Sequence, residues 1–273
     1  MSNIKALAER YFEENAVRYT EDYYFQLKDH PKWIRHKCIL ELVEEFVSEK
    51  GSKVLDIGCG PGLLAIDLGR KGYVGIGMDI SEKMLSIAKK QGSESDIRGW
   101  NFLLGDAERT NLEDASFDCV IASGVIEYMT EDSKILKEIN RLLKPGGYLI
   151  LNVSNLLGYS TSLNFVTDRL KKIPGVMKVV SKLRKIATNS EYGADQLHFS
   201  PRKHFVPNFH KTLGQYGFYS KSNKYFHFTF LPAPFSTLTH RFLHKAEAKL
   251  DVLDRTPLRI FGATQLICAR KVS

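Results

Sequence analysis

The sequence predicts an α/β fold built on a Rossmann-like, seven-stranded and mostly parallel sheet whose last strand is antiparallel. Three observations carry this prediction. Short apolar runs at residues 53–57, 73–79 and 117–122 are typical of buried strands. The first run leads directly into a turn with three glycines at alternate positions, and a helix-forming stretch follows it. Asp79 then ends the second run about 20 residues after Gly58, which is the offset of a β-α-β unit.

Residues 3–47, ahead of the first strand, are expected to form helices that cap the sheet. An apolar stripe at helical spacing marks the helix that leads into the first strand, and aromatic residues crowd the helix before it. These aromatic residues suit either core packing or a lid over a bound ligand. The stripe contains Ile39, Leu42, Val43, Phe46 and Val47, and the aromatic group contains Tyr11, Phe12, Tyr19, Tyr23, Tyr24 and Phe25.

The glycine turn is the centre of the predicted site. Glycine permits positive φ angles and lets a ligand approach the backbone closely. The free N–H groups and the positive dipole end of the following helix, residues 63–70, favour a carboxylate or a phosphate. A dinucleotide fold would need a third fingerprint glycine where Leu63 stands. The spacing therefore favours another nucleotide-like cofactor.

The rest of the core continues the alternation of strands and helices. A third strand ends at Asp106, and a fourth leads into an exit loop that reaches Tyr128. Open α/β sheets bind ligands at the carboxyl ends of their strands, so both acids and the exit loop are expected at one crevice. The other elements are a helix at 82–91 capped by Ser81, a helix at 135–143 stopped by Lys144-Pro145-Gly146-Gly147, and a fifth strand at 148–153.

Beyond residue 155 the pattern is less regular. Residues 161–188 form an insertion with two apolar helix faces, seven basic residues and one acid. This suits a membrane surface, a substrate lid or a helical pair packed on the core. A helix at 201–215 with Ser200 as its N-cap, a strand at 225–231, a helix at 235–253 and a final strand at 265–269 are expected to follow.

Charge and cysteine content narrow the function classes. The chain has a net charge of +8, but residues 156–273 carry +13 and the first 155 residues carry −5. This asymmetry favours an acidic partner for the C-terminal part. The four scattered cysteines include no C-x-x-C pair, which argues against a metal site and for a reducing compartment. Without a signal peptide or an apolar run long enough to cross a membrane, the protein is expected to be cytoplasmic or membrane-associated.

The motif V-L-D-I-G-C-G-P-G at 54–62 closely resembles the signature of class I S-adenosylmethionine (SAM) dependent methyltransferases. The motifs F-D-x-V at 117–120 and L-K-P-G-G at 143–147 follow at the expected intervals, so the resemblance covers roughly residues 10–155. Residues 11–19 are similar to the Y-F-x-x-x-A-x-x-Y cap of the ubiquinone and menaquinone type of small-molecule methyltransferases. In that type the cap closes over the SAM methyl group.

This resemblance implies SAM as the cofactor and assigns roles to individual residues. Asp79 would accept the ribose hydroxyls, Asp106 would meet the adenine amino group, and Arg35 would pair with the methionine carboxylate. We expect one methyltransferase domain over 1–273, with a cap at 1–50, a SAM-binding core at 51–155, a basic insertion at 156–215 and completing elements at 216–273. The predicted cofactor-binding residues are Tyr11, Tyr19, Arg35, Asp56, Gly58, Cys59, Gly60, Gly62, Asp79, Ile80, Met84, Asp106, Ala107, Ser123, Gly124 and Val125.

Methyl transfer from a sulfonium needs alignment and desolvation, and it needs a base only for a weak nucleophile. Histidine suits that role near neutral pH. The catalytic candidates are therefore His198 and His204, near the return from the insertion, together with Tyr19 of the cap. The rival candidates are His210, Tyr11, Glu127 and Tyr128.

The leading hypothesis is a SAM-dependent methyltransferase that acts at O, C or N of a small-molecule or lipid-like acceptor, with an anionic acceptor and membrane contact through 161–188 among the options. One alternative is an RNA or protein methyltransferase that uses the basic C-terminal part as its platform. An NAD-dependent oxidoreductase and a non-catalytic SAM-binding protein are the others. Nucleic acid is less favoured, because the exit loop at 122–125 lacks an N-P-P-Y motif and a Pro-Cys nucleophile. The oligomeric state stays open.

Overall fold

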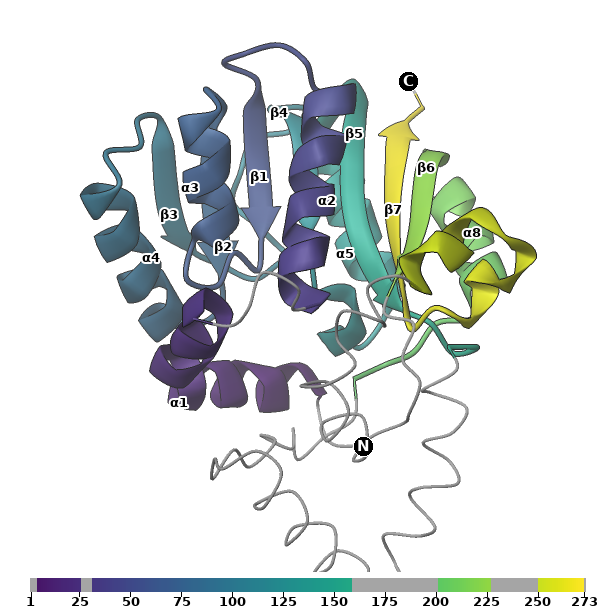
Figure 1. Cartoon of the computed structure of the whole chain (residues 1–273). Coiled ribbons are helices and arrows are strands. Elements are labelled where there is room, and N and C mark those ends of the chain that lie inside the picture. The colour runs from purple at the N-terminus through teal and green to yellow at the C-terminus, as the bar shows by residue number, and fades with distance from the viewer. Residues whose placement is uncertain (1–3, 26–30, 159–200, 227–249, 273) are drawn as a thin grey trace, which may run out of the picture.

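The sheet of this protein has seven strands in the order β3-β2-β1-β4-β5-β7-β6 (Figure 1). A computed structural model describes residues 4–25, 31–158, 201–226 and 250–272. The predicted seven-stranded, mostly parallel sheet is confirmed. The strands are β1 (Lys53–Ile57), β2 (Val74–Asp79), β3 (Trp100–Leu104), β4 (Phe117–Ala122), β5 (Leu143–Ser154), β6 (Phe218–Phe226) and β7 (Thr264–Lys271).

Strand β1 lies near the middle of the sheet and pairs in parallel with both β2 and β4. The order of the strands along the sheet reverses at this point, because β2 and β3 extend to one side of β1 and β4 and β5 to the other. Ligands of such sheets bind beyond the carboxyl ends of the strands at the reversal. Strand β7 is antiparallel to both β5 and β6, as predicted for the last strand.

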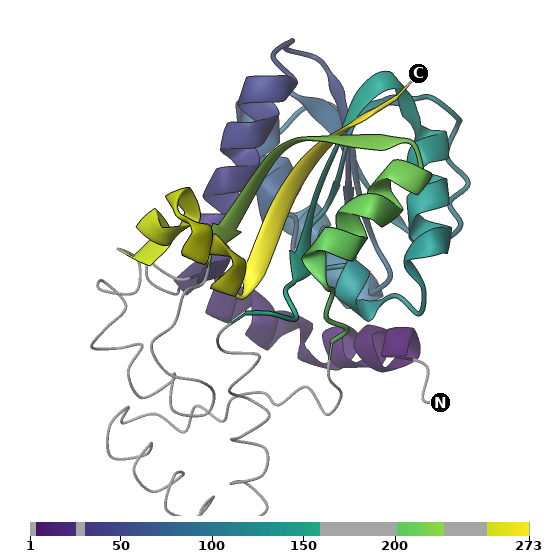
Figure 2. The same cartoon turned by 90° about the vertical axis from the view of Figure 1, so that its right-hand side faces the viewer.

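Helices cover both faces of the sheet, and Figure 2 shows it nearly edge-on between α2 and α3 on one side and α5 and α8 on the other. Helix α1 instead crosses the end of the sheet at which the parallel strands stop (Figure 1). The described α-helices are α1 (Ile4–Phe25), α2 (Pro31–Phe46), α3 (Leu63–Arg70), α4 (Glu82–Glu94), α5 (Asp132–Leu142) and α8 (Val206–Gln215). The described 3-10 helices are η1 (Ile126–Tyr128), η2 (Leu250–Arg255) and η3 (Pro257–Phe261).

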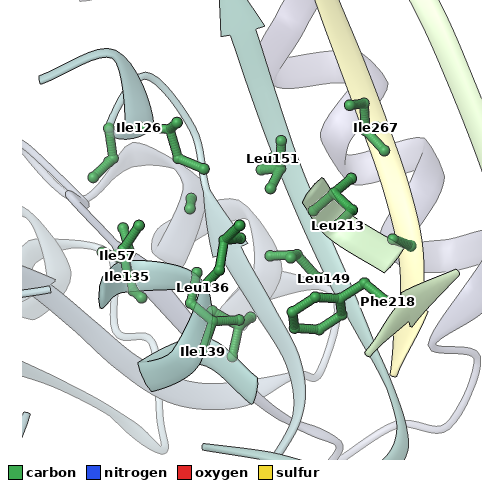
Figure 3. Close-up of a cluster of buried hydrophobic side chains, with 14 of the residues drawn as sticks. Ile57, Ile126, Ile135, Leu136, Ile139, Leu149, Leu151, Leu213, Phe218 and Ile267 are labelled. Carbon is green, nitrogen blue, oxygen red and sulfur yellow. The ribbon is translucent and has the colours of Figure 1, made fainter. Parts of the chain in front are cut away.

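The hydrophobic core consists of two clusters, one on each face of the sheet. Successive strand residues point to opposite faces, so Val54 joins the cluster under α2, α3 and α4, whereas Leu55 joins the cluster under α5 and α8. Figure 3 shows side chains of the second cluster, among them Leu136, Leu149 and Leu213. Burying such a side chain contributes about 1.5–3 kcal/mol, so this layer fixes the strands that carry the site.

Two polar side chains, Lys5 and Glu13, hold α1 across the carboxyl edge of the sheet. The Lys5 ammonium pairs with Asp106 at 2.5 Å and with Glu108 at 2.7 Å. The Glu13 carboxylate accepts hydrogen bonds from Ser81 Oγ at 2.6 Å and from the backbone N–H of Lys83 at 3.1 Å, at the N-terminus of α4. Negative charge is favourable at a helix N-terminus. The cap is therefore fixed at the ends of both β2 and β3.

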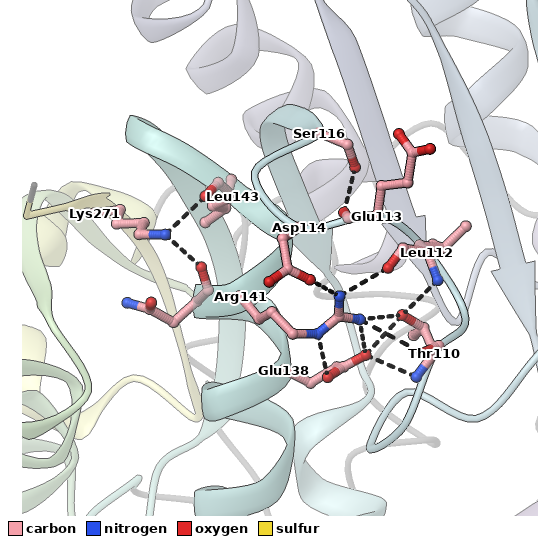
Figure 4. A network of polar contacts seen from close by, with 10 residues as sticks. Thr110, Leu112, Glu113, Asp114, Ser116, Glu138, Arg141, Leu143 and Lys271 are labelled. Carbon is pink, nitrogen blue, oxygen red and sulfur yellow. Dashed lines mark hydrogen bonds and ion pairs between the residues drawn. The ribbon is translucent and has the colours of Figure 1, made fainter.

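A second polar cluster lies at the opposite, amino edge of the sheet, where α5 ends and β4 begins (Figure 4). Arg141 donates to Glu138, to Asp114 and to the carbonyl of Leu112. Glu138 also accepts the backbone N–H and the hydroxyl of Thr110, each at 2.7 Å. Although burial opposes ionisation, the hydrogen bonds from Arg141 and Thr110 lower the pKa of Glu138 to about 2. We call Arg141, Glu138, Asp114 and Thr110 the paired cluster.

Two predicted elements in the C-terminal part begin elsewhere than expected, and a third, the helix at 235–253, lies outside the described residues over 235–249. The strand expected at 225–231 is β6, and it begins at Phe218 rather than at residue 225. In the described sheet β6 is an edge strand that pairs with β7 alone. An edge strand can carry polar residues along its length, so its first residues lack the apolar pattern that the prediction relied on. The helix expected from residue 201 begins only at Val206, with Pro207 in its first turn. Residues 201–205 are extended instead, and His204 bridges to Asn155. The described end of the helix expected at 235–253 forms the 3-10 helix η2.

Some predictions lie outside the described residues, namely the insertion at 161–188 and the candidate base His198. Within the described ranges, no helix is long and apolar enough to cross a membrane. Those same ranges contain no group of metal-ligating side chains, and all four cysteines are buried thiols.

Candidate functional site

The three glycines of the turn have different surroundings. All three have positive φ, with values of 68° at Gly58, 52° at Gly60 and 83° at Gly62. A Cβ on Gly58 would lie 2.4 Å from Val125 Cγ2, and one on Gly62 would lie 2.9 Å from the Ala88 side chain. A Cβ on Gly60 would meet nothing within 4 Å. Gly58 and Gly62 therefore serve close packing, whereas Gly60 leaves open space beside the backbone.

Asp79, at the end of β2, is bound to the same turn. Its Oδ2 accepts the N–H of Gly60 at 2.8 Å, and its Oδ1 accepts the N–H of Ser81 at 2.9 Å. Burial raises the pKa of Asp79, and these backbone hydrogen bonds oppose the shift. Each carboxylate oxygen has further acceptor capacity, so Asp79 can accept ligand hydroxyls next to Gly60.

A small cavity opens between the glycine turn and the cap. Its volume is about 60 Å³, well below the roughly 300 Å³ of a typical small-molecule pocket. Tyr19 from α1 and Arg35 from α2 form the side opposite the turn. The lining residues are Tyr19, Arg35, His36, Ile39, Asp56, Gly58, Cys59, Gly60, Pro61, Leu63, Leu64 and Ser123. A larger ligand therefore needs a displacement of the cap.

Two ionisable side chains, one basic and one acidic, line this cavity without being paired in the described residues. Arg35 forms no ion pair or side-chain hydrogen bond in the described part of the chain, although its guanidinium lies close to Gly124. Asp56 is only 3% exposed and likewise has no side-chain hydrogen bond there. Burial, reinforced by repulsion from Asp79, raises the pKa of Asp56 to about 8. A zwitterionic ligand, with one carboxylate and one ammonium group, would satisfy both side chains.

The exit loop of β4 is held in place from β5. The side-chain oxygen of Asn152, a buried residue in an otherwise apolar strand, accepts the N–H of Gly124 at 2.7 Å and the hydroxyl of Ser123 at 3.2 Å. Val125 then packs against Gly58. These contacts position the loop beside the turn.

The aromatic residues of the cap meet this loop. The ring of Phe12 makes edge-to-face contacts with Tyr19 and with Tyr128, each at a centroid distance of 5.6 Å. Burial raises the pKa of Tyr19, with Arg35 opposing the shift. The same is true of Tyr128. Both phenols therefore stay protonated near neutral pH, which suits hydrogen-bond donation better than proton removal.

The described histidines near the carboxyl edge differ in how their ring nitrogens are used. His204 Nε2 lies 3.1 Å from Asp132 Oδ1, while its buried Nδ1 has no partner in the described ranges. Hydrogen bonds and charge from His204 and Arg202 outweigh burial and lower the pKa of Asp132. In the neutral form of His204, a proton on Nε2 donates to the ionised carboxylate, and Nδ1 then carries a lone pair. Both ring nitrogens of His210 are used, by Ser220 and Gln265.

The remaining predicted site residues lie around this centre rather than along the cavity. Asp106 already accepts from Lys5, and the Met84 N–H donates to the N-cap Ser81. Tyr11, Gly62, Asp79, Ile80, Met84, Asp106, Ala107, Gly124 and Val125 are not among its lining residues. Sequence reasoning missed His36, Ile39, Pro61, Leu63, Leu64, Asp132 and Asn152. Two features of the sequence could have pointed to some of them. His36 and Ile39 stand at helical spacing beside Arg35, and Asn152 is the one amide side chain in the apolar run at 148–153.

Comparison with known proteins identifies the central part of the chain. Residues 55–151 match the family described as Methyltransferase domain. The ubiquinone biosynthesis O-methyltransferase of Coxiella burnetii is 30% identical over 116 residues, which are 42% of this chain and 49% of that protein. The demethylmenaquinone methyltransferase of Listeria monocytogenes is 32% identical over 126 residues, which are 45% of this chain and 51% of that protein. The chain thus spans about half the length of the curated relatives it matches.

Solved structures extend the likeness of the fold to most of the chain. Magnesium protoporphyrin IX methyltransferase from Synechocystis PCC 6803, crystallised with S-adenosylhomocysteine (SAH), has a TM-score of 0.64 at 18% identity over 98% of this chain and 99% of that one. The [4+2]-cyclase SpnF has a TM-score of 0.55 at 19% identity over 86% and 80% of the two chains. These likenesses show the fold alone. Together with the family match, they confirm the resemblance to class I SAM-dependent methyltransferases for the central region.

Proposed function

We propose that this chain binds SAM at the cavity beside the glycine turn and transfers its methyl group to a small-molecule acceptor. One observation carries the proposal: Arg35 and Asp56 are unpaired in the described residues and line the same cavity. An amino-acid moiety matches them, because its carboxylate pairs with the guanidinium and its ammonium favours the ionised form of Asp56. The names of both relatives refer to small molecules, which favours such an acceptor over RNA or protein.

The residues around the cavity fit the cofactor. Arg35 would hold the carboxylate and Asp56 the ammonium, while Asp79 would accept the ribose hydroxyls. The open side of Gly60 leaves room for the cofactor next to the backbone. When bound, SAM supplies an electrophilic methyl group.

His204 is the residue we assign to proton removal from a hydroxyl or an acidic carbon of the acceptor. Its Nδ1 lone pair accepts the proton, and Asp132 stabilises the resulting imidazolium through Nε2. Tyr19, which stays protonated, is assigned to hydrogen-bond donation and to closing the cavity on the cap side. His198 keeps its place as an alternative base outside the described residues.

Calorimetry with SAH tests cofactor binding. The wild type should bind, whereas Gly60→Val should block the space beside the turn and Asp79→Ala should remove the ribose acceptors. Gly214→Val is a matched control, because Gly214 lies in α8 and a Cβ there would also meet nothing within 4 Å. Unchanged affinity in both site variants, or tight binding of NAD by the wild type, would contradict the assignment.

Methyl transfer itself needs a separate measurement, since the fold is shared with a cyclase. Radiolabelled SAM, incubated with quinol, phenol and amine acceptors and with RNA, should label one of the small molecules. Transfer of label to RNA only would favour the alternative of an RNA methyltransferase. SAH binding without labelling of any acceptor would instead favour a non-catalytic SAM-binding protein.

For the acceptor, we propose lipid-like or anionic chemistry and membrane contact through residues 161–188. The support is the excess of basic residues in that segment and the +13 charge of residues 156–273. Flotation with liposomes tests the contact. The protein should float with anionic liposomes and remain behind with neutral ones. Equal behaviour on both would contradict the proposal.

A further inference from the structure

Three buried side-chain polar atoms at the carboxyl edge of the sheet have no partner in the described ranges. One is Glu108 Oε1, whose carboxylate is already paired with Lys5 through Oε2; the other two belong to side chains that cofactor binding does not explain. They are Glu127 Oε2, in η1, and His204 Nδ1. Glu127 is 8% exposed and His204 is 7% exposed. A buried acceptor without a donor is costly, so such an atom in a folded protein calls for an explanation.

The backbone holds these two residues on neighbouring segments. The N–H of Arg202 donates to the carbonyl of Glu127 at 2.8 Å, which aligns residues 202–204 with η1. The Arg202 side chain donates to the carbonyl of Met129 and to Asp132, and Asp132 also binds His204. Arg202 and Asp132 thus hold His204 beside the loop that carries Glu127.

We infer that Glu127 Oε2 and His204 Nδ1 form a two-point site for the acceptor molecule and accept hydrogen bonds from two neighbouring donors on it. This inference rests on the proposed function and adds to it that the acceptor has a second O–H or N–H group beside the reacting one. Glu127 is an acceptor-binding residue in this scheme. His204 binds the reacting group, and Glu127 binds its neighbour.

The electrostatic surroundings of Glu127 agree with this role. Burial raises its pKa, and the charge of Arg35, together with that of His204 in its protonated form, opposes the shift. The other groups that face it are the phenols of Tyr19 and Tyr128, whose pKa values its charge helps to raise. Glu127 is therefore near both the cavity-lining Arg35 and the proposed base. A ligand donor at Oε2 would provide the hydrogen bond that the described protein groups do not.

Binding of three ring compounds to SAH-saturated protein tests the inference by calorimetry. Catechol offers two hydroxyl donors, 1,2-phenylenediamine offers two amino donors, and 1,2-dimethoxybenzene has the same shape without donors. The wild type should bind at least one of the two-donor probes roughly 100-fold more tightly than the dimethoxy compound, about 10-fold for each of the two hydrogen bonds. The preferred probe tells whether the acceptor is a hydroxyl or an amino compound.

In Glu127→Leu that preference should fall about 10-fold, while the affinity for SAH and for the dimethoxy compound stays at the wild-type value. Glu127→Gln is a second variant that keeps an acceptor oxygen, and it should lose less. Glu131→Leu, four residues along the same loop and exposed, is the control and should lose nothing.

Three outcomes would overturn the inference. Equal binding of all three probes by the wild type, or binding of none, would show that the site does not select two donors. An unchanged preference in Glu127→Leu would show that Glu127 does not touch the acceptor. Weaker SAH binding in Glu127→Leu would place Glu127 in the cofactor site. Failure of the wild type to bind SAH would instead contradict the proposed function, which separates the two failures.

Discussion

At the two edges of the sheet, side chains of the same types differ in whether they are paired. At the amino edge, Arg141 and Glu138 of the paired cluster fill their hydrogen-bonding capacity with each other and with the loop before β4 (Figure 4). At the carboxyl edge, Arg35 and Glu127 lie near each other but form no ion pair in the described residues, and Asp56 lacks a partner there as well. Asp56 and Glu127 are buried, whereas Arg35 is half-buried, and buried polar groups are normally satisfied within the protein. The difference indicates that the carboxyl edge is completed by a ligand.

Asp56→Asn should give the largest effect, a gain in stability at high pH. The pKa of Asp56 in the folded protein is about 8, against 3.8 as its ordinary value. Folding therefore raises this pKa, so between pH 4 and about pH 8 the folded protein keeps a proton that the unfolded chain releases. The free energy of unfolding falls increasingly over this range, and below pH 4 the penalty is absent. Each pKa unit is about 1.4 kcal/mol, and the new amide costs roughly 1–3 kcal/mol if unsatisfied.

We accordingly expect Asp56→Asn to unfold at a higher urea concentration than the wild type at pH 8, by about 2–4 kcal/mol, with the difference shrinking toward pH 4. Chemical denaturation at both pH values measures this. A variant that is less stable than the wild type at pH 8 would mean that Asp56 has a structural partner. Binding of SAH should weaken at the same time, since Asn cannot pair with an ammonium.

Arg141→Leu tests the paired cluster and should cost about 2 kcal/mol of stability, because hydrogen bonds to charged groups contribute roughly 1.5–3 kcal/mol and Arg141 is partly exposed. Urea denaturation at pH 7 measures the loss, and SAH affinity at a temperature where the variant is folded should equal that of the wild type. Arg10→Leu is the control, since Arg10 forms an exposed ion pair with Glu14, and it should leave the midpoint unchanged. A drop in SAH affinity in Arg141→Leu would show that the two edges are coupled.

Arg35→Gln is the counterpart at the carboxyl edge and should have the smallest effect on stability, within about 0.5 kcal/mol, because no partner is lost. Its effect should instead appear in binding, with SAH affinity reduced roughly 10- to 100-fold through loss of the carboxylate contact. Calorimetry and urea denaturation on the same samples measure both. If Arg35→Gln were destabilised as much as Arg141→Leu and bound SAH normally, Arg35 would have a structural role like that of Arg141, and the proposed difference between the two edges would be wrong.

The central strands and the glycine turn could be predicted from the sequence because local patterns determine them. Apolar runs fix β1, β2 and β4, and a glycine turn needs particular residues at particular positions. Strand β6 was misplaced because an edge strand has no strong apolar pattern. The pairing of His204 with Asp132 could not be foreseen, since 72 residues separate them and only the tertiary fold brings them together. Sequence alone likewise gave no sign that Arg35, Asp56 and Glu127 would lack partners.

The position of α1 has a consequence for the rate of turnover. Lys5 and Glu13 fix the cap over a cavity of about 60 Å³, too small for a nucleotide-like cofactor. Under the proposed function, each cycle includes an opening of the cap before SAM enters and another before the spent cofactor leaves. These two contacts then set how long the product remains bound, and release of product rather than chemistry can limit such enzymes. Removing the contacts of Lys5 or of Glu13 would shorten that residence time without any change at the reacting atoms.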